Sequence, residues 1–522
     1  MFLFPYYVII GILAHGSSAL PELIRIGGLF NVSEDAQIMA FRNAVNKINM
    51  DRSILPRSKL IPEVEIVPPY DSFRVANTVC QLLGKGVAAI FGPSSDATSE
   101  DVESICDTME VPHIETRWDL YQRRGTVLLN LHPHPAALAR VYADLVRAWR
   151  WKSFTVIYED DDGLVRLNEL LKLYDPKGYT VTVRQLDHGD NYRKGLRKIK
   201  NSGETNIVLD CSINILYEVL KQAQQVGLMT SQHNYIITNP DMHTIDLEPF
   251  QHGGTNITGV QLIDPEDMLV KKTVAEWVEA GFAASSLTPS NLKVDTALMY
   301  DAVILYGRAL QQLDSSQNVK IGPLDCNKEG NWEHGLSLIN FMRVDEVKGL
   351  SGVIRFDNQG FRTNFVLNIV ELTEDHLIQV GTWNSTEGLN ITREGTLNRT
   401  AAGAVDSEDH IDSLQNKTFI VLTALSPPYG YLKHSATKLT GNDRFEGFGI
   451  EVIHEVSLML GFNYTFRLQH DGVYGSLNRK TGQWNGMIRQ LMDRKADLAI
   501  TDLTITYDRE SAADFTMPFM NL

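Results

Sequence analysis

Hydroxyl, carboxylate and guanidinium groups lie close together near the end of the 522-residue sequence. The stretch TDLT (501–504) follows an apolar run at 496–500, and Arg509 comes five residues after Thr504. An arginine beside free backbone N–H groups and hydroxyls is suited to gripping a carboxylate in bidentate fashion. The alternative is that Arg509 pairs internally with a neighbouring acid, namely Asp508, Glu510 or Asp514. The residue types alone leave both interpretations open.

The patterns around these residues predict the elements that hold them. Residues 487–494 have the amphipathic pattern of a helix, and the run at 496–500 is typical of a buried strand. Strand character resumes at Lys417 (TFIVLTAL) and runs into a double proline that presents Tyr429. We therefore expect a second domain to start near Lys417 and to carry the polar residues just after its strands.

A larger α/β domain precedes it. Strand and helix patterns alternate with short connections, which is typical of sheets covered by helices on both faces. At this length we expect two lobes, with the chain crossing between them, in place of a single sheet. The expected strands are 24–30, 64–68, 87–92, 154–158, 179–185 and 206–209, with a strand pair at 352–372 turning at 358–360. The expected helices are 36–51, 73–86, 136–151, 164–174, 215–226 and 296–312.

Composition excludes several classes of function. Hydrophobic residues make up 43% and charged residues 21%, which is ordinary for globular domains. The net charge of −16 argues against a nucleic-acid partner, because phosphate binding needs a concentrated basic surface.

The sequence contains no motif of a known catalytic or metal site. No nucleophile elbow, P-loop, HExxH motif or zinc-ligand spacing occurs. The acidic run at 159–162 is read as an exposed turn in preference to a metal or acid/base site. We expect no enzyme activity, no cofactor and no metal.

The start of the chain and its glycosylation motifs indicate secretion. Residues 1–19 are apolar and end in small residues, which predicts a signal peptide, with a short membrane anchor as the alternative. No other apolar run is long enough to span a membrane. Seven Asn-x-Ser/Thr sites are expected glycosylation sites: Asn31, Asn256, Asn384, Asn390, Asn398, Asn416 and Asn463. Three of them crowd into a polar stretch that we interpret as a linker at 376–414.

The four cysteines predict one disulfide. Cys106 lies in an expected helix and Cys211 ends an expected strand, so both are most simply buried free thiols. Cys80 and Cys326 are the better candidates for a bond. It would close a loop of about 250 residues and contribute about 4–5 kcal/mol in the chain-entropy model.

Three patches after residue 415 together resemble one receptor family. They are TALSPPYGY (423–431), RFEGFGIEVIHEVSLMLGFNYTFRL (444–468) and QWNGMIRQLMDRKADLAITDLTITYDRESAADFTMPFMNL (483–522). The third patch is similar to the first ligand-binding segment of ionotropic glutamate receptors, and its sequence is most similar to that of the kainate branch. The segments VCQLLGKGVAAIFGPSS, VPHIETRWD and IVLDCS resemble the amino-terminal domain of the same receptors.

The resemblance implies the fold of both parts. It implies a two-lobed amino-terminal domain at 20–375 that is similar to periplasmic binding proteins, and the Cys80–Cys326 pair fits the usual disulfide of that domain. Residues 415–522 would form one partial lobe of a second domain of the same type. The family's second ligand-binding segment and pore helices are not among these residues, so we expect the chain to stop before the channel.

Roles at the site follow from the same resemblance. Arg509 would hold the α-carboxylate of glutamate, helped by the backbone N–H and hydroxyl of Thr504. The backbone carbonyl of Asp502 would take the ammonium group. Tyr429 would lie over the ligand as an aromatic lid with cation–π attraction to the ammonium, and Tyr474 would line the pocket. For each tyrosine the alternative is simple surface packing.

Asp502 departs from the family pattern, because most members outside the NMDA branch have proline there. The backbone carbonyl survives this change, but a carboxylate is added near the ligand. It would either assist the ammonium or repel one of the acids of glutamate. We therefore expect an altered agonist preference.

The implied function is that of the extracellular part of a kainate-type subunit. In the intact family, closure of the ligand-binding lobes opens a cation channel that mediates excitatory synaptic transmission. The implied partners are L-glutamate or a related amino acid and other subunits in a dimer of dimers, on the extracellular, postsynaptic side of the plasma membrane. If the chain truly ended at Leu522, it would be a secreted form or decoy. A soluble amino-acid-binding protein does not explain the second domain, and a guanylate cyclase receptor would lack the 483–522 signature.

Overall fold

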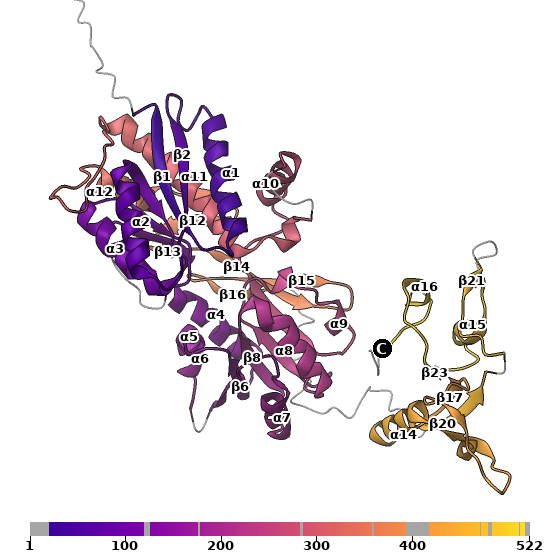
Figure 1. Cartoon of the computed structure of the whole chain (residues 1–522). Helices are drawn as coiled ribbons and strands as arrows, with labels where there is room; N and C mark the ends of the chain where they lie inside the picture. Colours follow the sequence, from indigo (N-terminus) through magenta and orange to yellow (C-terminus); the bar gives the residue numbers. More distant parts are fainter. Residues whose placement is uncertain are drawn as a thin grey trace, which may run out of the picture. The chain divides into compact units, whose positions relative to one another are not determined.

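The structure is a computed structural model (Figure 1). It describes residues 20–119, 126–175, 178–281, 286–357, 360–392, 417–469, 471–478, 483–510 and 512–516. The expected signal peptide lies outside these ranges. Two compact units divide the chain at residue 404, and each is described by itself. No helix within the described ranges is long and apolar enough to cross a membrane.

The first unit contains two sheets of eight described strands, one in each lobe. The first-lobe sheet has the order β11-β12-β13-β5-β4-β3-β1-β2. Its strands are β1 (Leu23–Phe30), β2 (Lys59–Ile66), β3 (Val87–Phe91), β4 (His113–Glu115), β5 (Leu128–Pro133), β11 (Val347–Gly349), β12 (Gly352–Phe356) and β13 (Phe361–Thr363). The second-lobe sheet has the order β16-β15-β14-β10-β9-β8-β6-β7. Its strands are β6 (Ser153–Tyr158), β7 (Thr180–Gln185), β8 (Asn206–Asp210), β9 (Asn234–Ile237), β10 (Asn256–Gln261), β14 (Val366–Leu372), β15 (Leu377–Asn384) and β16 (Gly388–Ile391).

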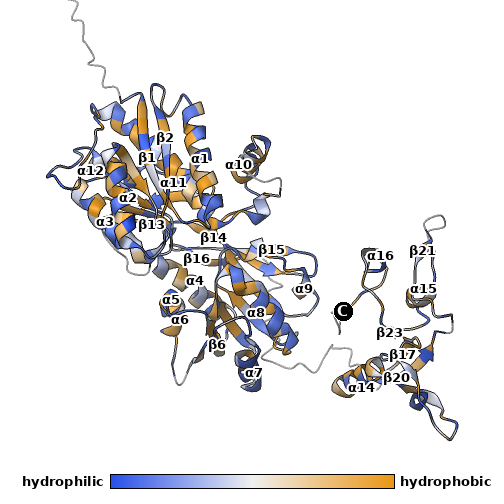
Figure 2. Cartoon of the chain, in the orientation of Figure 1, coloured by the Kyte–Doolittle hydropathy of each residue, from blue (hydrophilic) through white to orange (hydrophobic). Residues whose placement is uncertain are grey.

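Helices pack against both sheets, because this packing buries the apolar faces of the sheets and of the helices away from water. Every residue of β3 is buried, as expected for a central parallel strand between helix layers. Figure 2 shows hydrophobic and hydrophilic faces on helices such as α1 and α8. The helices are α1 (Asp35–Met50), α2 (Ser72–Gly84), α3 (Asp96–Met109), α4 (Pro135–Ala148), α5 (Asp161–Arg166), α6 (Asn168–Leu171), α7 (Arg193–Asn201), α8 (Ile213–Gln225), α9 (Glu248–Gln251), α10 (Met268–Glu279), α11 (Val294–Ser316) and α12 (Gly335–Val344).

The chain passes between the two sheets three times, between β5 and β6, between β10 and β11, and between β13 and β14. This confirms the expected two-lobed α/β architecture. The strand pair expected at 352–372 is confirmed only for β12 and β13, which are antiparallel. β14 instead joins the other sheet. Asn364, between β13 and β14, has a φ of 56°, a left-handed conformation that asparagine tolerates at sharp changes of direction.

Two further sequence predictions need correction. The helix expected at 164–174 is two short helices, α5 and α6, separated at the buried Leu167. The linker expected at 376–414 begins later, because β15 and β16 add to the second sheet by antiparallel pairing. Trp383 in β15 is only 2% exposed, and its indole N–H donates to Asp144 in α4 at 3.0 Å. The domain therefore extends beyond residue 375.

The cysteine prediction is confirmed. Cys80 in α2 and Cys326 form a disulfide across 246 residues of sequence. Cys106 and Cys211 are free and buried. Burial raises the pKa of both thiols, so their reactive thiolate forms are disfavoured.

Five of the seven expected glycosylation sites lie in the described ranges: Asn31, Asn256, Asn384, Asn390 and Asn463. Asn398 and Asn416 lie outside them. Asn390 and Asn463 are exposed, whereas Asn256 is half-buried and its amide nitrogen donates to Asn234 at 2.8 Å. Glycosylation of these sites stays a prediction.

A buried carboxylate links the lobes and predicts a dependence of stability on pH. Asp241 follows β9, and its Oδ1 accepts from the backbone N–H of Val294 at the start of α11 at 2.8 Å. Burial raises the pKa of Asp241 to about 6. The folded state thus keeps this proton at pH values where the unfolded state has lost it, and stability falls as pH rises through about 6. We expect Asp241→Asn to raise the free energy of unfolding by about 1–3 kcal/mol at pH 8 and by about half as much at pH 5, where this carboxyl is already mostly ionised in the unfolded chain.

Thermal denaturation of both forms at the two pH values measures this effect. Asp51→Asn is the matched control, because hydrogen bonds from Ser53 lower the pKa of Asp51. Its substitution should give no gain at pH 8. An equal gain for Asp241→Asn at pH 5 and pH 8 would contradict the prediction.

The second unit contains a three-stranded parallel sheet of order β20-β17-β23. Its strands are β17 (Thr418–Thr423), β20 (Asn463–Leu468) and β23 (Leu498–Ile500). Helix α14 (Phe448–Leu460) connects β17 to β20, and α15 (Gly486–Met492) connects β20 to β23. The short pairs β18 (Tyr431–Leu432) with β19 (Phe445–Glu446) and β21 (Leu477–Asn478) with β22 (Gln483–Trp484) flank these helices. Helix α16 (Tyr507–Glu510) follows the sheet.

Candidate functional site

The candidate site lies where the connections of the second unit diverge. Thr423 and Ile500 are paired residues at the carboxyl ends of β17 and β23. The chain leaves β17 toward β20 on one side, whereas β23 lies on the other. Ligands of open parallel sheets bind beyond the carboxyl ends of strands at such a switch point. The loops that carry Tyr429 and Asp502 start here.

Asp502 is the centre of a hydrogen-bonded cluster. Its Oδ1 accepts from the hydroxyls of Tyr474 at 2.6 Å and Thr501 at 2.8 Å. Its Oδ2 accepts from the hydroxyl of Ser426 at 2.8 Å. The carboxylate therefore joins three loops: the turn after β17, the loop between β20 and β21, and the segment after β23.

The electrostatics keep this carboxylate ionised. Partial desolvation acts to raise the pKa of Asp502, but hydrogen bonds from Tyr474, Ser426 and Thr501 outweigh it and lower the pKa. The bond to Asp502 in turn raises the pKa of the Tyr474 hydroxyl, which keeps its proton as donor. Much of the acceptor capacity of Asp502 is thus used inside the protein.

Arg509 lies against two of the same loops. Its Nη1 donates to the carbonyl oxygen of Thr504 at 2.8 Å, and its Nε donates to that of Gly475 at 3.1 Å. Gly475 directly follows Tyr474, so one guanidinium connects the two segments that the Tyr474–Asp502 bond also joins. These contacts are with backbone carbonyls and not with carboxylates. The arrangement keeps a positive charge beside the exposed Thr504.

Tyr429 is half-buried and is positioned through its backbone. Its N–H donates to the carbonyl of Ser426 at 2.8 Å, and its own carbonyl accepts from Gly449 N–H at 2.9 Å at the start of α14. Gly447 has a φ of 137°, and a Cβ there would lie 2.6 Å from the carbonyl oxygen of Tyr429. Only glycine lets the helix start this close to the tyrosine.

The structure brings all five sequence-predicted residues to one loop region of the second unit. Tyr474 contacts Asp502 directly, Arg509 contacts Thr504 directly, and Tyr429 is connected to Asp502 through Ser426. Sequence reasoning missed Ser426 and Thr501. A hydroxyl just before the Pro-Pro turn and another directly after strand β23 were the available signals. The run at 496–500 was expected to be a buried strand, but the residues of β23 are exposed or only half-buried.

The acidic run at 159–162 was expected to be an exposed turn, but Asp160 is the N-cap of α5 and Asp161 and Asp162 form its first turn. The Glu159 carboxylate accepts from the backbone N–H of Ser212 at 2.6 Å, and Asp160 caps α5 by accepting from Gly163 N–H at 3.0 Å. Throughout the described ranges, no group of three or more His, Cys, Asp or Glu side chains is placed to hold a metal ion.

The two units define a class of protein, a receptor with tandem ligand-binding domains of periplasmic-binding-protein type. Residues 37–375 match the family model "Receptor family ligand binding region", and residues 417–522 match "Ligated ion channel L-glutamate- and glycine-binding site". The first match alone covers more than half of the chain.

Curated relatives narrow this class. The chain is 37% identical over 515 residues to "Glutamate receptor ionotropic, kainate 1" of Mus musculus, which covers 96% of this chain and 60% of that protein. It is 36% identical over 531 residues to the protein of that name from Homo sapiens, covering 96% and 56%. The chain belongs to the kainate-type ionotropic glutamate receptor family. It spans about three-fifths of the length of these relatives.

Proposed function

We propose that this chain is the extracellular, agonist-sensing part of a subunit of a glutamate-gated cation channel. The observation that carries the proposal is the loop cluster at the β17–β23 switch point, where Arg509, Thr504 and two tyrosines gather. In the complete subunit, Arg509 would hold the α-carboxylate of L-glutamate with Thr504. The carbonyl of Asp502 would accept from the ammonium, while Tyr429 and Tyr474 would line the pocket.

The amino-terminal domain would serve subunit assembly. Tyr70, two residues before α2, and Phe73, in the first turn of α2, are 87% and 84% exposed. Large apolar side chains exposed together are typical of protein contact surfaces. Such a subunit would act at the postsynaptic plasma membrane with both described units outside the cell.

The carboxylate of Asp502 would set agonist preference by holding the pocket wall in place. Proline at this position removes the acceptor of three hydrogen bonds and frees Tyr474 and Ser426. We expect Asp502→Pro in the complete subunit to change the relative affinities of two agonists at least fivefold, equivalent to about 1 kcal/mol. Competition binding with a panel of labelled agonists measures the ranking.

Two matched variants isolate the cause. Asp502→Asn keeps an acceptor oxygen for Tyr474 and should shift the ranking less than Asp502→Pro. Asp493→Asn changes a carboxylate of the same unit that pairs with Arg489 and Lys495, and it should leave the ranking unchanged. An agonist ranking unchanged by Asp502→Pro would refute this role. Absence of glutamate binding by the wild-type subunit would refute the proposed function itself.

A further inference from the structure

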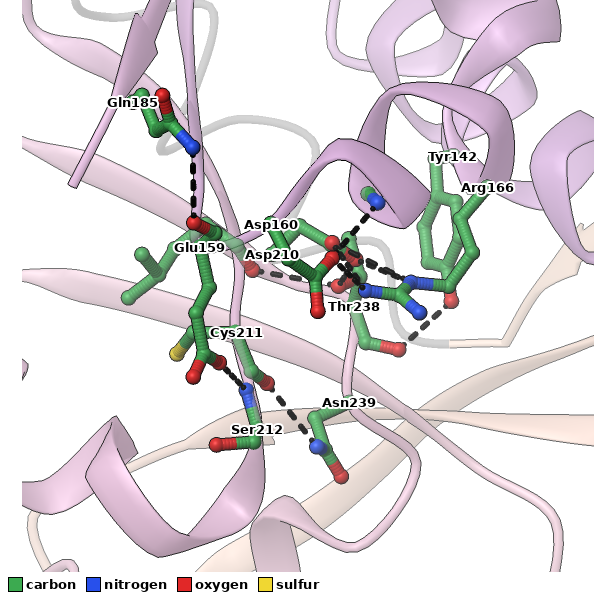
Figure 3. Close-up of polar contacts among 12 residues, drawn as sticks. Tyr142, Glu159, Asp160, Arg166, Gln185, Asp210, Cys211, Ser212, Thr238 and Asn239 are labelled. Atoms are coloured by element: carbon green, nitrogen blue, oxygen red, sulfur yellow. Dashed lines mark hydrogen bonds and ion pairs between the residues drawn. The ribbon is translucent and has the colours of Figure 1, made fainter. Parts of the chain in front are cut away.

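A second polar cluster lies in the first unit, at the carboxyl ends of the second-lobe strands (Figure 3). Asp210 ends β8, and its Oδ1 accepts from the Thr238 hydroxyl at 2.6 Å. Arg166 ends α5, and its guanidinium faces this carboxylate. The Nη2–Oδ2 distance is 3.0 Å, and Nε lies 3.3 Å from both carboxylate oxygens. Asp160 adds a third acceptor at 3.2 Å from Nη2.

The start of α5 lies directly on Asp210. A Cβ at Gly163 would be only 2.5 Å from the Oδ2 atom of Asp210, so this position accepts no side chain. The side chain of Asp210 is 3% exposed and that of Arg166 is 30% exposed. Desolvation acts to lower the pKa of Arg166, but the acids around it outweigh this effect and raise the pKa.

Arg166 also reaches the first lobe. Its guanidinium carbon lies 5.0 Å from the ring centroid of Trp118, within the range of a cation–π interaction. Trp118 follows β4, and its carbonyl accepts from Arg117 Nη1 at 3.2 Å. The carbonyl of Arg117 accepts from the Asn130 amide at 2.9 Å. Trp118 is thus positioned by residues of the first lobe, whereas Arg166 is positioned by residues of the second lobe.

These residues together form a receptor for a cation at the position where this fold class binds ligands. The strands β4 and β8 belong to different lobes, and their carboxyl ends carry the aromatic ring and the buried acid. An ammonium or guanidinium ligand is stabilised by a carboxylate together with the face of an aromatic ring. The position is filled by a side chain of the chain itself.

We propose that Arg166 is a built-in ligand between the two lobes of the first unit, occupying a cation site formed by Asp210, Asp160 and Trp118 and thereby holding the lobes together. Removal of the arginine side chain leaves a site whose remaining residues are complementary to a guanidinium group. A small alkylguanidinium fits this site and restores the contact between the lobes.

Thermal unfolding of the complete chain with N-ethylguanidinium tests the proposal. Arg166→Ala should lower Tm by about 2–5 °C. Millimolar N-ethylguanidinium should recover at least half of this loss. Wild type and Arg193→Ala should show no recovery at the same concentrations, because Arg193 hydrogen-bonds only exposed amides of Gln225 and Asn191 within the described residues.

A substitution of Trp118 distinguishes a contact between the two lobes from an ion pair that lies within the second lobe alone. Rescue should be lost in the double variant Arg166→Ala, Trp118→Leu. If N-ethylguanidinium rescues both variants equally, the cation site lies within the second lobe alone and the proposal is wrong. Trp118→Leu in the wild-type background keeps the Arg166–Asp210 pair and should itself lower Tm. An unchanged Tm there would also overturn the proposal, even if Arg166→Ala does not fold.

Discussion

Arg509→Lys in the complete subunit is expected to weaken glutamate binding about 100-fold, equivalent to about 3 kcal/mol. Lysine keeps the positive charge but presents a point charge in place of a planar fork, so it cannot grip a carboxylate through two parallel bonds. It would also lose the geometry that joins the carbonyls of Thr504 and Gly475 at 2.8 and 3.1 Å. Competition against a labelled agonist measures the loss of affinity.

Arg467→Lys is the matched control for this substitution. Arg467 lies in β20 of the same unit, and its Nη1 donates to the backbone carbonyl of Lys495 at 2.9 Å. It shares the chemistry of Arg509 but lies away from the loop cluster, so we expect its substitution to change affinity less than twofold. Equal losses for the two variants would indicate damage to the fold. A loss of less than tenfold for Arg509→Lys would contradict the assigned role.

Local patterns predicted many of the elements, although strands such as β5, β9 and β10 and helices such as α7 and α10 were not predicted, and the two lobes were inferred from the length of the chain. Runs such as 87–91 are apolar throughout because the strand is buried on both faces, and that signal is present in the residues themselves. The helix at 164–174 was mispredicted because its pattern is continuous across Leu167. The strands at 377–391 were missed because their polar and glycosylation-prone composition hides that Trp383 packs into the second lobe.

The candidate site was predictable in its members but not in its connections. Arg509, Thr504 and both tyrosines could be proposed from motif and resemblance. The bonds that organise them join residues far apart in sequence: Tyr474 and Asp502 are 28 residues apart, and Ser426 and Asp502 are 76 apart. Such contacts depend on strand order, which brings β17 beside β23 although β20 lies between them in sequence. The expectation that Asp502 acts directly on the ligand therefore becomes a proposal that it holds the pocket wall.

Removal of the disulfide is the prediction with the largest expected effect on stability. Replacing both Cys80 and Cys326 with serine should lower the free energy of unfolding of the amino-terminal domain by about 4–5 kcal/mol, because the bond closes a very long loop in the unfolded chain. Contacts next to Cys326 would reduce this loss of stability. The N–H of Leu324 donates to the carbonyl of Leu83 at 2.9 Å, so the segment before Cys326 keeps an attachment to the end of α2.

Denaturant unfolding with and without dithiothreitol measures the effect and supplies its own control. The reductant should destabilise the wild-type chain to the level of the double variant. It should leave the double variant unchanged, because Cys106 and Cys211 are already free thiols. If dithiothreitol lowered the stability of the double variant as well, Cys106 and Cys211 would form a second disulfide, and their assignment as free thiols would be wrong. If the double variant lost less than about 1 kcal/mol, the contacts around Leu324 and not the covalent bond would hold this loop on α2.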